Sequence, residues 1–175
     1  YHRKWQTYDT INMSIGQGYI LENPLSMACF AASVARGEVF TKPTLVHHAD
    51  APTQHTESIG LTVKQRKALF DGMEGCTVYG TAKTLQLETQ KIPGLRIAGK
   101  TGTAQIPGNK NAAWFICFAP IEHPEIAIAV MLEGDTPGEE FGGGRNAAPV
   151  AQAILRKWKE KKDRPPTFVP PAKES

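Results

Sequence analysis

Long apolar segments are absent from this sequence. The longest apolar runs, residues 112–119 and 126–132, are far shorter than the roughly 20 residues that a membrane helix needs. Cysteine is scarce and odd in number: Cys29, Cys76 and Cys117 are widely spaced and have mainly apolar neighbours. We therefore expect three small buried side chains rather than a disulfide framework or a zinc site.

Two further patterns are missing, those of a metal site and of a nucleic-acid-binding surface. His47, His48 and His55 share one stretch, but no cysteine or carboxylate at a suitable spacing completes a ligand set. The net charge is only +3, and much of the basic excess falls in residues 156–164, which we interpret as a solvated helix end. Because no basic stripe interleaved with aromatic residues occurs elsewhere, we expect no nucleic-acid partner. The incomplete ligand set likewise leads us to expect no metal, and we expect no cofactor.

Serine is also scarce, and none of the serines has an activating context. The chain has five serines, at positions 14, 26, 33, 58 and 175, and none is followed by lysine three positions later or by Asn or Asp two positions later. Arg36 follows Ser33 at plus three, but a guanidinium does not release its proton at a useful pH. A serine nucleophile with a lysine base is therefore not found in these residues.

Capping signals predict helices in two segments. Asn23 and Pro24 are typical of an N-cap and a first helical residue, and Gly37 is typical of a helix end. Thr62, with Gln65 three positions later, has the capping-box pattern that begins a helix. A loop is expected at residues 15–19 and an extended connection at residues 42–59.

A further helix is expected after Gly142-Gly143-Gly144. The apolar spacing predicts the buried faces of the first and last helices to be Leu25, Ala28, Cys29 and Ala32, and Val150, Ala153, Ile154 and Trp158. Four prolines follow, so we expect residues 163–175 to form a disordered tail after a domain portion at residues 1–162.

Between these helices the pattern indicates a sheet. Residues 95–106, 112–119 and 126–132 are β-prone or apolar runs separated by short turn-forming segments. Such short connections favour antiparallel neighbours, because a parallel crossover needs about a dozen residues or more. The predicted fold class is α+β, an antiparallel sheet with flanking helices.

Residues 94–101 match a phosphate-loop pattern, and the context decides between two interpretations. A phosphate loop needs a strand before it and a helix that starts at its Lys-Thr pair. Here Pro93 interrupts the preceding segment, while Gly102 and Pro107 resist a following helix. We interpret the residues as a strand, on which Lys100 and Gly102 share one face and Thr101 and Thr103 the other.

A strand of this kind at the rim of a cleft can pair with an extended peptide and donate amide hydrogens to an oxyanion. Lys100-Thr101-Gly102 is also a short signature of penicillin-recognising serine acyltransferases. Nearly the whole chain resembles the transpeptidase domain of class B penicillin-binding proteins, and most of all the penicillin-binding protein 2 type. The segments that carry this resemblance are residues 15–19, 24–25, 80–82, 100–105, 113–115 and 118–120.

The resemblance implies the C-terminal part of a penicillin-binding protein/serine β-lactamase-like transpeptidase fold, whose nucleophilic serine lies upstream. It implies that Lys100 shapes the field around the nucleophile and that the Thr103 amide forms one arm of the oxyanion hole. The Thr101 and Thr103 hydroxyls would hold the substrate carboxylate, Gly102 would keep the strand face open, and Gln105 would line its continuation.

The implied activity is peptidoglycan D,D-transpeptidation, which this chain alone would not perform because it lacks the nucleophile. Implied partners are the stem peptide, β-lactams, the upstream part of the same protein and membrane wall-synthesis proteins such as a glycan polymerase. The implied location is the periplasmic or extracellular face of the bacterial cytoplasmic membrane, with an anchoring helix upstream. Two alternatives remain open: a β-lactam-hydrolysing or β-lactam-sensing domain, and a non-catalytic scaffold.

Overall fold

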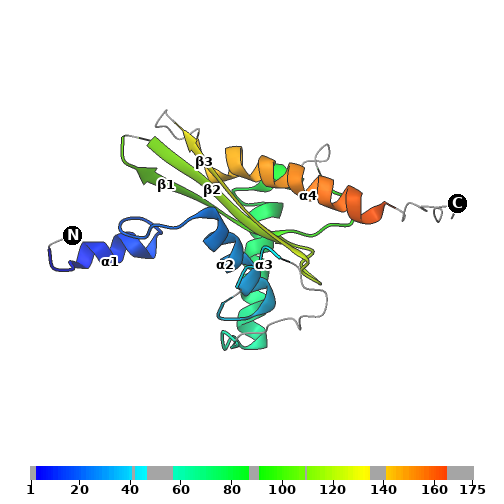
Figure 1. Ribbon diagram of the computed structural model, residues 1–175, viewed down its shortest axis with the longest axis horizontal. Coiled ribbons are helices and arrows are strands. Elements are labelled where there is room, and N and C mark those ends of the chain that lie inside the picture. Colours follow the sequence, from blue (N-terminus) through cyan, green and yellow to red (C-terminus); the bar gives the residue numbers. More distant parts are fainter. Residues whose placement is uncertain are drawn as a thin grey trace, which may run out of the picture.

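The computed structural model describes residues 3–40, 42–46, 57–86, 91–108, 110–134 and 141–164. Figure 1 shows a central sheet with helices on both sides of it, and an N-terminal helix that projects to one side. In chain order the elements are α1 (Thr7–Ser14), α2 (Pro24–Arg36), α3 (Val63–Val78), the 3-10 helix η1 (Lys83–Gln86), β1 (Ala98–Ile106), β2 (Lys110–Ala119), β3 (Ile126–Gly134), the π-helical turn η2 (Gly143–Ala147) and α4 (Ala148–Asp163).

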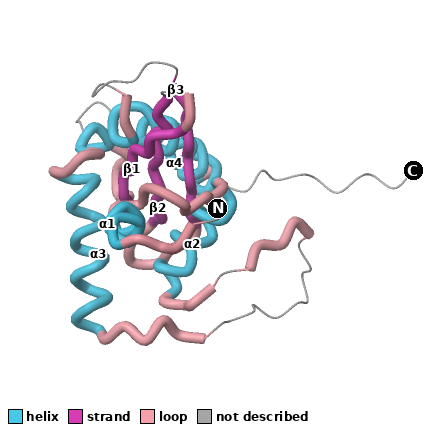
Figure 2. Tube along the Cα trace, turned by 90° about the vertical axis from the view of Figure 1, so that its left-hand side faces the viewer, coloured by secondary structure: helices cyan, strands magenta, loops and turns pink. Residues whose placement is uncertain are grey.

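The three strands form one antiparallel sheet in the order β1-β2-β3, which confirms the predicted α+β class. The register places Thr101 opposite Phe115 and Lys100 opposite Ile116. Because β1 pairs only with β2 within the described part of the chain, its outer edge is a sheet edge (Figure 2). This edge carries the Lys-Thr-Gly sequence.

The predicted helix ends are confirmed. The Asn23 side chain accepts a hydrogen bond from the Ser26 amide, and α2 ends at Gly37, whose φ of 71° lies in the left-handed region that favours glycine. Thr62 and Gln65 form the expected capping box at the start of α3. Helix α1 was not predicted, although the Gln6 to Asp9 spacing carries its own capping box.

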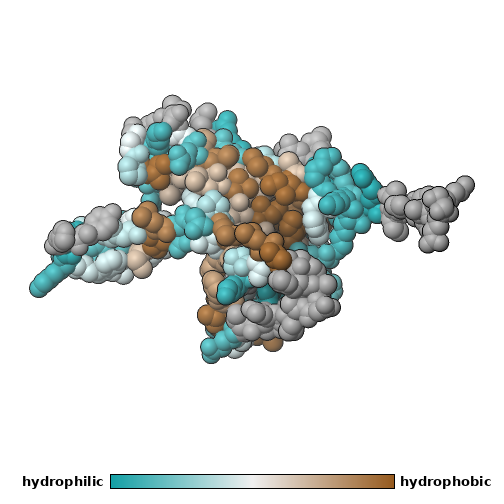
Figure 3. Space-filling model, viewed as in Figure 1, coloured by the Kyte–Doolittle hydropathy of each residue, from teal (hydrophilic) through white to brown (hydrophobic). Residues whose placement is uncertain are grey.

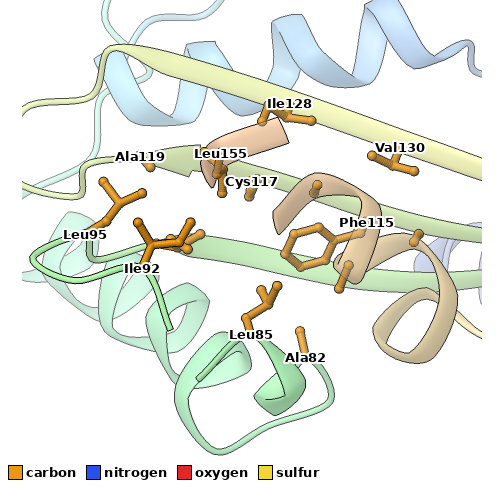
Figure 4. Close-up of a cluster of buried hydrophobic side chains, with 14 residues drawn as sticks. Ala82, Leu85, Ile92, Leu95, Phe115, Cys117, Ala119, Ile128, Val130 and Leu155 are labelled. Carbon is orange, nitrogen blue, oxygen red and sulfur yellow. The ribbon is translucent and has the colours of Figure 1, made fainter. Parts of the chain in front are cut away.

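Side chains alternate across the sheet, so each face has its own core. On one face Phe115 and Cys117 of β2 pack with Leu85 and Leu155 (Figure 4), and Ile97 belongs to the same cluster. This cluster also contains residues of β3, η2 and α4. Each of these larger apolar side chains stabilises the fold by about 1.5–3 kcal/mol through removal from water.

The opposite face of the sheet packs against α2 and α3. Phe118 of β2 is fully buried and lies in a cluster with Ala35 of α2 and Met73 of α3. The Phe70 and Phe118 rings lie 5.0 Å apart between their centroids and are tilted by 55°. This is a favourable aromatic geometry, and it fixes α3 against the sheet beside β1.

The predicted buried face of α4 is wrong in its register. The buried residues are Ala148, Ala151, Gln152 and Leu155, and Trp158 is partly buried, whereas Val150 and Ile154 are 40% and 44% exposed and Ala153 is exposed. Small alanines let the helix approach the sheet closely, and Leu155 then fills the remaining space. The size and apolarity of the side chains alone therefore predict the wrong face of α4 as buried.

The predicted face of α2 is partly wrong as well. Cys29 is buried and Ala28 and Ala32 are half-buried, but Leu25 is 58% exposed. Leu25 lies in the first turn of α2, where the described residues leave it facing solvent beside a cavity.

All three cysteines are free: Cys29 and Cys117 are buried as expected, and Cys76 is half-buried. Parts of the predicted 42–59 connection and of the 163–175 tail lie outside the described residues. None of the helices in the described ranges is long and apolar enough to span a membrane.

The described surface carries many exposed large apolar side chains. Figure 3 shows apolar residues gathered near the centre of the face seen in Figure 1. Large apolar side chains are also exposed at separate positions along the chain, such as Leu21 at 88%, Ile15 at 72% and Val63 at 89%. An exposed apolar patch such as the one in Figure 3 is typical of surfaces that another polypeptide covers.

Candidate active site

Strand β1 holds the Lys-Thr-Gly residues at the sheet edge. Thr101 lies directly opposite Phe115 and shares the α4-facing side of the sheet with it. Lys100 lies opposite Ile116 on the other side, is exposed, and donates a hydrogen bond from Nζ to the Thr101 carbonyl at 2.8 Å. The lysine and the threonine hydroxyls therefore stand on opposite faces of one exposed strand edge.

The threonine face opens into a cavity of about 300 Å³. Its lining combines hydroxyl groups, bare glycine backbone and one cationic residue, and consists of Thr81, Thr101, Gly102, Thr103, Gly142, Gly143, Gly144 and Arg145. Arg145 is the only charged residue among these described lining residues. The cavity is therefore suited to a small group that accepts hydrogen bonds and carries negative charge.

The glycine turn, Gly142-Gly143-Gly144, packs so closely that a Cβ at Gly143 or Gly144 would overlap neighbouring backbone. A Cβ at Gly143 would come within 2.1 Å of the Trp114 carbonyl oxygen and 2.7 Å of the Gly102 carbonyl oxygen. A Cβ at Gly144 would lie 1.8 Å from the Thr81 carbonyl oxygen. The consecutive glycines thus form the back wall of the cavity by direct backbone packing.

Side chains hold this turn in place. The Gly142 backbone N–H donates to Asn146 Oδ1 at 3.0 Å, and the Asn146 backbone N–H donates back to the Gly142 carbonyl at 2.9 Å. The Thr84 hydroxyl donates to the Gly144 carbonyl at 3.3 Å. The turn is consequently anchored both to itself and to η1.

Thr81 joins the site from the segment after α3. Its Oγ1 lies 2.6 Å from Thr101 Oγ1 and 3.5 Å from Cys76 Sγ. These contacts link the end of α3 to β1 through three side chains. Thr81 is therefore a direct neighbour of one predicted substrate-binding hydroxyl.

An ion-pair cluster lies beside the N-terminal end of β1. The Arg96 guanidinium contacts the Glu74 carboxylate at 2.6 and 2.5 Å and the Glu122 carboxylate at 2.5 Å. The Glu74 and Glu122 carboxylates raise the pKa of Arg96. The backbone N–H of Glu122, followed by Arg96, lowers the pKa of the Glu122 carboxyl group, and partial desolvation opposes that effect. This cluster ties α3, β1 and the segment after β2 together outside the cavity.

The structure brings only part of the predicted site together. Thr101, Gly102 and Thr103 line the cavity, whereas Lys100 and Gln105 are exposed and lie outside its lining. The strand interpretation is confirmed, because Lys100 and Thr101 lie inside β1 where a phosphate loop would begin a helix. The described residues contain no cluster of three metal-ligating side chains, and His47, His48 and His55 lie outside the described residues.

Sequence reasoning missed Thr81 and residues 142–145 as parts of the site. In the sequence, residues 80–82 contribute only to the family resemblance, and the three glycines only precede a predicted helix. Three consecutive glycines do carry a signal, because a simple helix start needs none while close backbone approach does.

Comparisons with known proteins agree with this geometry. The sequence model of the family described as "Penicillin binding protein transpeptidase domain" matches residues 2–156. The peptidoglycan D,D-transpeptidase PbpA of Mycobacterium tuberculosis is 33% identical over 149 residues, which cover 81% of this chain and 30% of that protein.

Solved structures show the same likeness. The imipenem acyl-enzyme complex of penicillin-binding protein A from M. tuberculosis has a TM-score of 0.60 at 29% identity, over 82% of this chain and 33% of that one. The penicillin-binding protein PBP2 of Helicobacter pylori, solved in complex with MreC, has a TM-score of 0.66 at 26% identity, over 91% of this chain and 29% of that one. This chain thus spans about a third of the length of the proteins it matches. With its Lys-Thr-Gly strand at the sheet edge, the chain belongs to the penicillin-binding protein transpeptidase domain family.

Proposed function

We propose that this chain forms the Lys-Thr-Gly wall of a peptidoglycan D,D-transpeptidase active site, as the C-terminal part of the domain. The observation that carries the proposal is the exposed edge of β1, where Lys100 stands on one face and Thr101 and Thr103 open into a small cavity on the other. The nucleophilic serine comes from the upstream part of the same protein, because no serine here has the required lysine.

The proposed reaction is an acyl transfer in two steps. The serine hydroxyl attacks the carbonyl carbon of the penultimate D-Ala, the peptide C–N bond breaks, and the terminal D-Ala leaves with a proton on its nitrogen. An amine of a neighbouring stem peptide then attacks the ester and releases the serine. Lys100 and Thr103 take the catalytic roles: the Lys100 ammonium favours the anionic states, and the Thr103 amide donates to the oxyanion.

The substrate contacts in this proposal come from the cavity face of β1. The Thr101 and Thr103 hydroxyls hold the terminal carboxylate, and the outer backbone edge of β1 pairs with the extended stem peptide. Gly102 keeps the strand face open, and Gln105 lies farther along the same strand. β-Lactams occupy the same place and stop at the acyl stage, a proposal supported by the imipenem acyl-enzyme of the mycobacterial relative.

We place the domain portion at residues 1–162 and the tail at residues 163–175. The exposed apolar surface, including a cavity of about 630 Å³ lined by Leu25, Phe30 and Phe40, fits coverage by the upstream part of the domain. The proposed location is the outer face of the cytoplasmic membrane, where an upstream helix would anchor the domain. Proposed partners are membrane wall-synthesis proteins such as a glycan polymerase, and the H. pylori complex of PBP2 with MreC supports a protein partner for such a domain.

The test is intact-mass analysis after incubation with a fluorescent penicillin. The chain is tested alone and mixed with a polypeptide that carries the upstream part of the domain. We expect an adduct on the upstream polypeptide only in the mixture, and its loss with Lys100→Ala but not with Lys64→Ala, a matched change of an exposed lysine on α3. A folded mixture that forms no adduct would refute the transpeptidase proposal and favour a scaffold role.

A β-lactam-hydrolysing or β-lactam-sensing domain is the second candidate, since it shares the Lys-Thr-Gly strand. The two differ in the lifetime of the acyl-enzyme. A transpeptidase holds the penicilloyl group for much longer than its acylation takes, whereas a hydrolase releases it and turns over.

A further inference from the structure

The hydroxyl of Thr81 is placed to control the hydroxyl of Thr101. The two Oγ1 atoms lie 2.6 Å apart, and the Cys76 thiol approaches Thr81 Oγ1 at 3.5 Å. Cys76 belongs to the last turn of α3, Thr81 follows that helix, and Thr101 lies on β1. Helix α3, the segment that follows it and β1 are therefore joined by one short hydrogen-bonded chain of three side chains.

A proton count limits the states of this chain. A hydroxyl has one proton to donate and two lone pairs that accept, so only one proton can lie between Thr81 and Thr101. If Thr101 donates to Thr81, the Thr101 oxygen presents only lone pairs to the cavity. If Thr81 donates to Thr101, the Thr101 proton is available to a ligand.

An ionised carboxylate decides between these states because it only accepts hydrogen bonds. A carboxylate bound at Thr101 requires Thr101 to donate, and Thr101 must then accept from Thr81. Thr81 in turn has a lone pair for the Cys76 thiol, which is a weak donor. Arg145, the charged residue in the described lining, favours the same anionic ligand.

We propose that Thr81 is a positioning residue that, with the support of Cys76, orients the Thr101 hydroxyl as a hydrogen-bond donor to the carboxylate of the acyl donor. This inference rests on the proposed transpeptidase function and deepens it. Hydrogen bonds in such a chain polarise one another, so the donor strength of Thr101 increases when Thr81 donates to it. Without the Thr81 hydroxyl, the Thr101 proton is free to rotate away and its oxygen loses this support.

The experiment compares acylation of the mixed or complete domain by benzylpenicillin and by its carboxamide. Thr81→Val removes the hydroxyl with little change in shape, Thr81→Ser retains it, and Cys76→Ala removes the outermost donor. We expect Thr81→Val to reduce the second-order acylation rate constant for benzylpenicillin by about tenfold, the effect of one hydrogen bond to a charged group. For the carboxamide, whose NH₂ can donate to Thr101, we expect a reduction of about twofold or less.

Rescue and control variants separate orientation from support of the fold. Thr81→Ser is expected to restore the acylation rate to within about twofold of the wild type, and Cys76→Ala to reduce it by about two- to threefold. Thr84→Val is the matched control, because Thr84 bonds the same glycine turn at the Gly144 carbonyl but does not contact Thr101. It is expected to affect both penicillins equally.

Equal losses for both penicillins in Thr81→Val, or no loss for either, would overturn the positioning role while leaving the transpeptidase proposal intact. If Thr81→Val does not fold, equal effects of Cys76→Ala on the two penicillins would overturn it in the same way. A wild-type domain that benzylpenicillin does not acylate would overturn the proposed function, and this assignment with it.

Discussion

Gly99 lies against the ring of Phe115, and a Cβ on Gly99 would come within 2.6 Å of the ring Cζ. Phe115 is fully buried in the α4-facing core, so its ring can yield only by displacing neighbouring core side chains. The glycine just before Lys100 is therefore required by packing and has no direct role in the cavity. The same strand thus combines a packing requirement with a functional sequence.

Gly99→Ala is expected to destabilise the fold by about 2 kcal/mol, the usual effect of overpacking a core. Gly102→Ala is the matched control on the same strand, because its Cβ would meet Trp114 Cβ at an ordinary 3.5 Å. Thermal or urea unfolding of the two variants provides the measurement. Equal stability of both variants would contradict this account of Phe115 packing.

The glycine turn predicts a second difference between neighbouring positions. Gly144→Ala places a Cβ 1.8 Å from the Thr81 carbonyl oxygen, and backbone must move to relieve that overlap. We expect a loss of more than about 3 kcal/mol, or no folded protein. Gly142→Ala would meet only Thr103 Oγ1 at 3.2 Å, so we expect a folded protein with weaker penicillin acylation. Unfolding curves and acylation rates distinguish the two, and a stable Gly144→Ala variant would show that the turn lies farther from Thr81.

Thiol reactivity should separate the cysteines. Burial raises the pKa of Cys117 to about 12, so at pH 8 about one thiol in 10⁴ is ionised, and the side chain is fully buried as well. Iodoacetamide is therefore expected to modify half-buried Cys76 in the native protein, and Cys117 only after unfolding. Peptide mass mapping before and after addition of urea checks this. Rapid native labelling of Cys117 would mean that the α4-facing core opens readily.

The pH dependence of stability should include a contribution from Glu122. Its folded-state pKa lies below the ordinary value of 4.5, so its stabilising effect is present above pH 4.5 and is lost as the pH falls through the folded-state pKa. Glu122→Gln is expected to lower Tm by only about 1–2 °C at pH 7, because the Arg96–Glu122 ion pair is exposed. At pH 3 the Tm of the variant is expected to differ little from that of the wild type. A Tm difference that persists at pH 3 would assign the effect to packing rather than to charge.

Local signals in the sequence predicted α2, α3 and the three strands, although not α1. The Asn23 cap, the Thr62–Gln65 capping box and the left-handed Gly37 act within one turn of backbone, so they can be recognised without tertiary information. The short connections likewise predicted the antiparallel sheet. The register of α4 could not be predicted, because it depends on how closely Ala148 and Ala151 approach the sheet.

The candidate site was predicted only along one strand. The spacing of Lys100, Thr101 and Thr103 shows which residues share a face, so that part followed from alternation. Thr81 and Arg145 reach the cavity from segments about 20 and 40 residues away, and only the packing of the glycine turn on β1 brings them together. Spacing along a sequence carries no information on such a long-range contact.

The arrangement of the sheet also sets an expectation for the order of folding. β1, β2 and β3 are consecutive in the chain and joined by short turns, so their pairing closes small loops, whereas α2 contacts β3 across roughly a hundred residues of sequence. Contacts distant in sequence form more slowly, because a long loop must be ordered first. The three-stranded meander is therefore expected to acquire amide protection before α2 docks. During synthesis, α2 would leave the ribosome well before β3, and it could pack against the sheet only after β3 has been made.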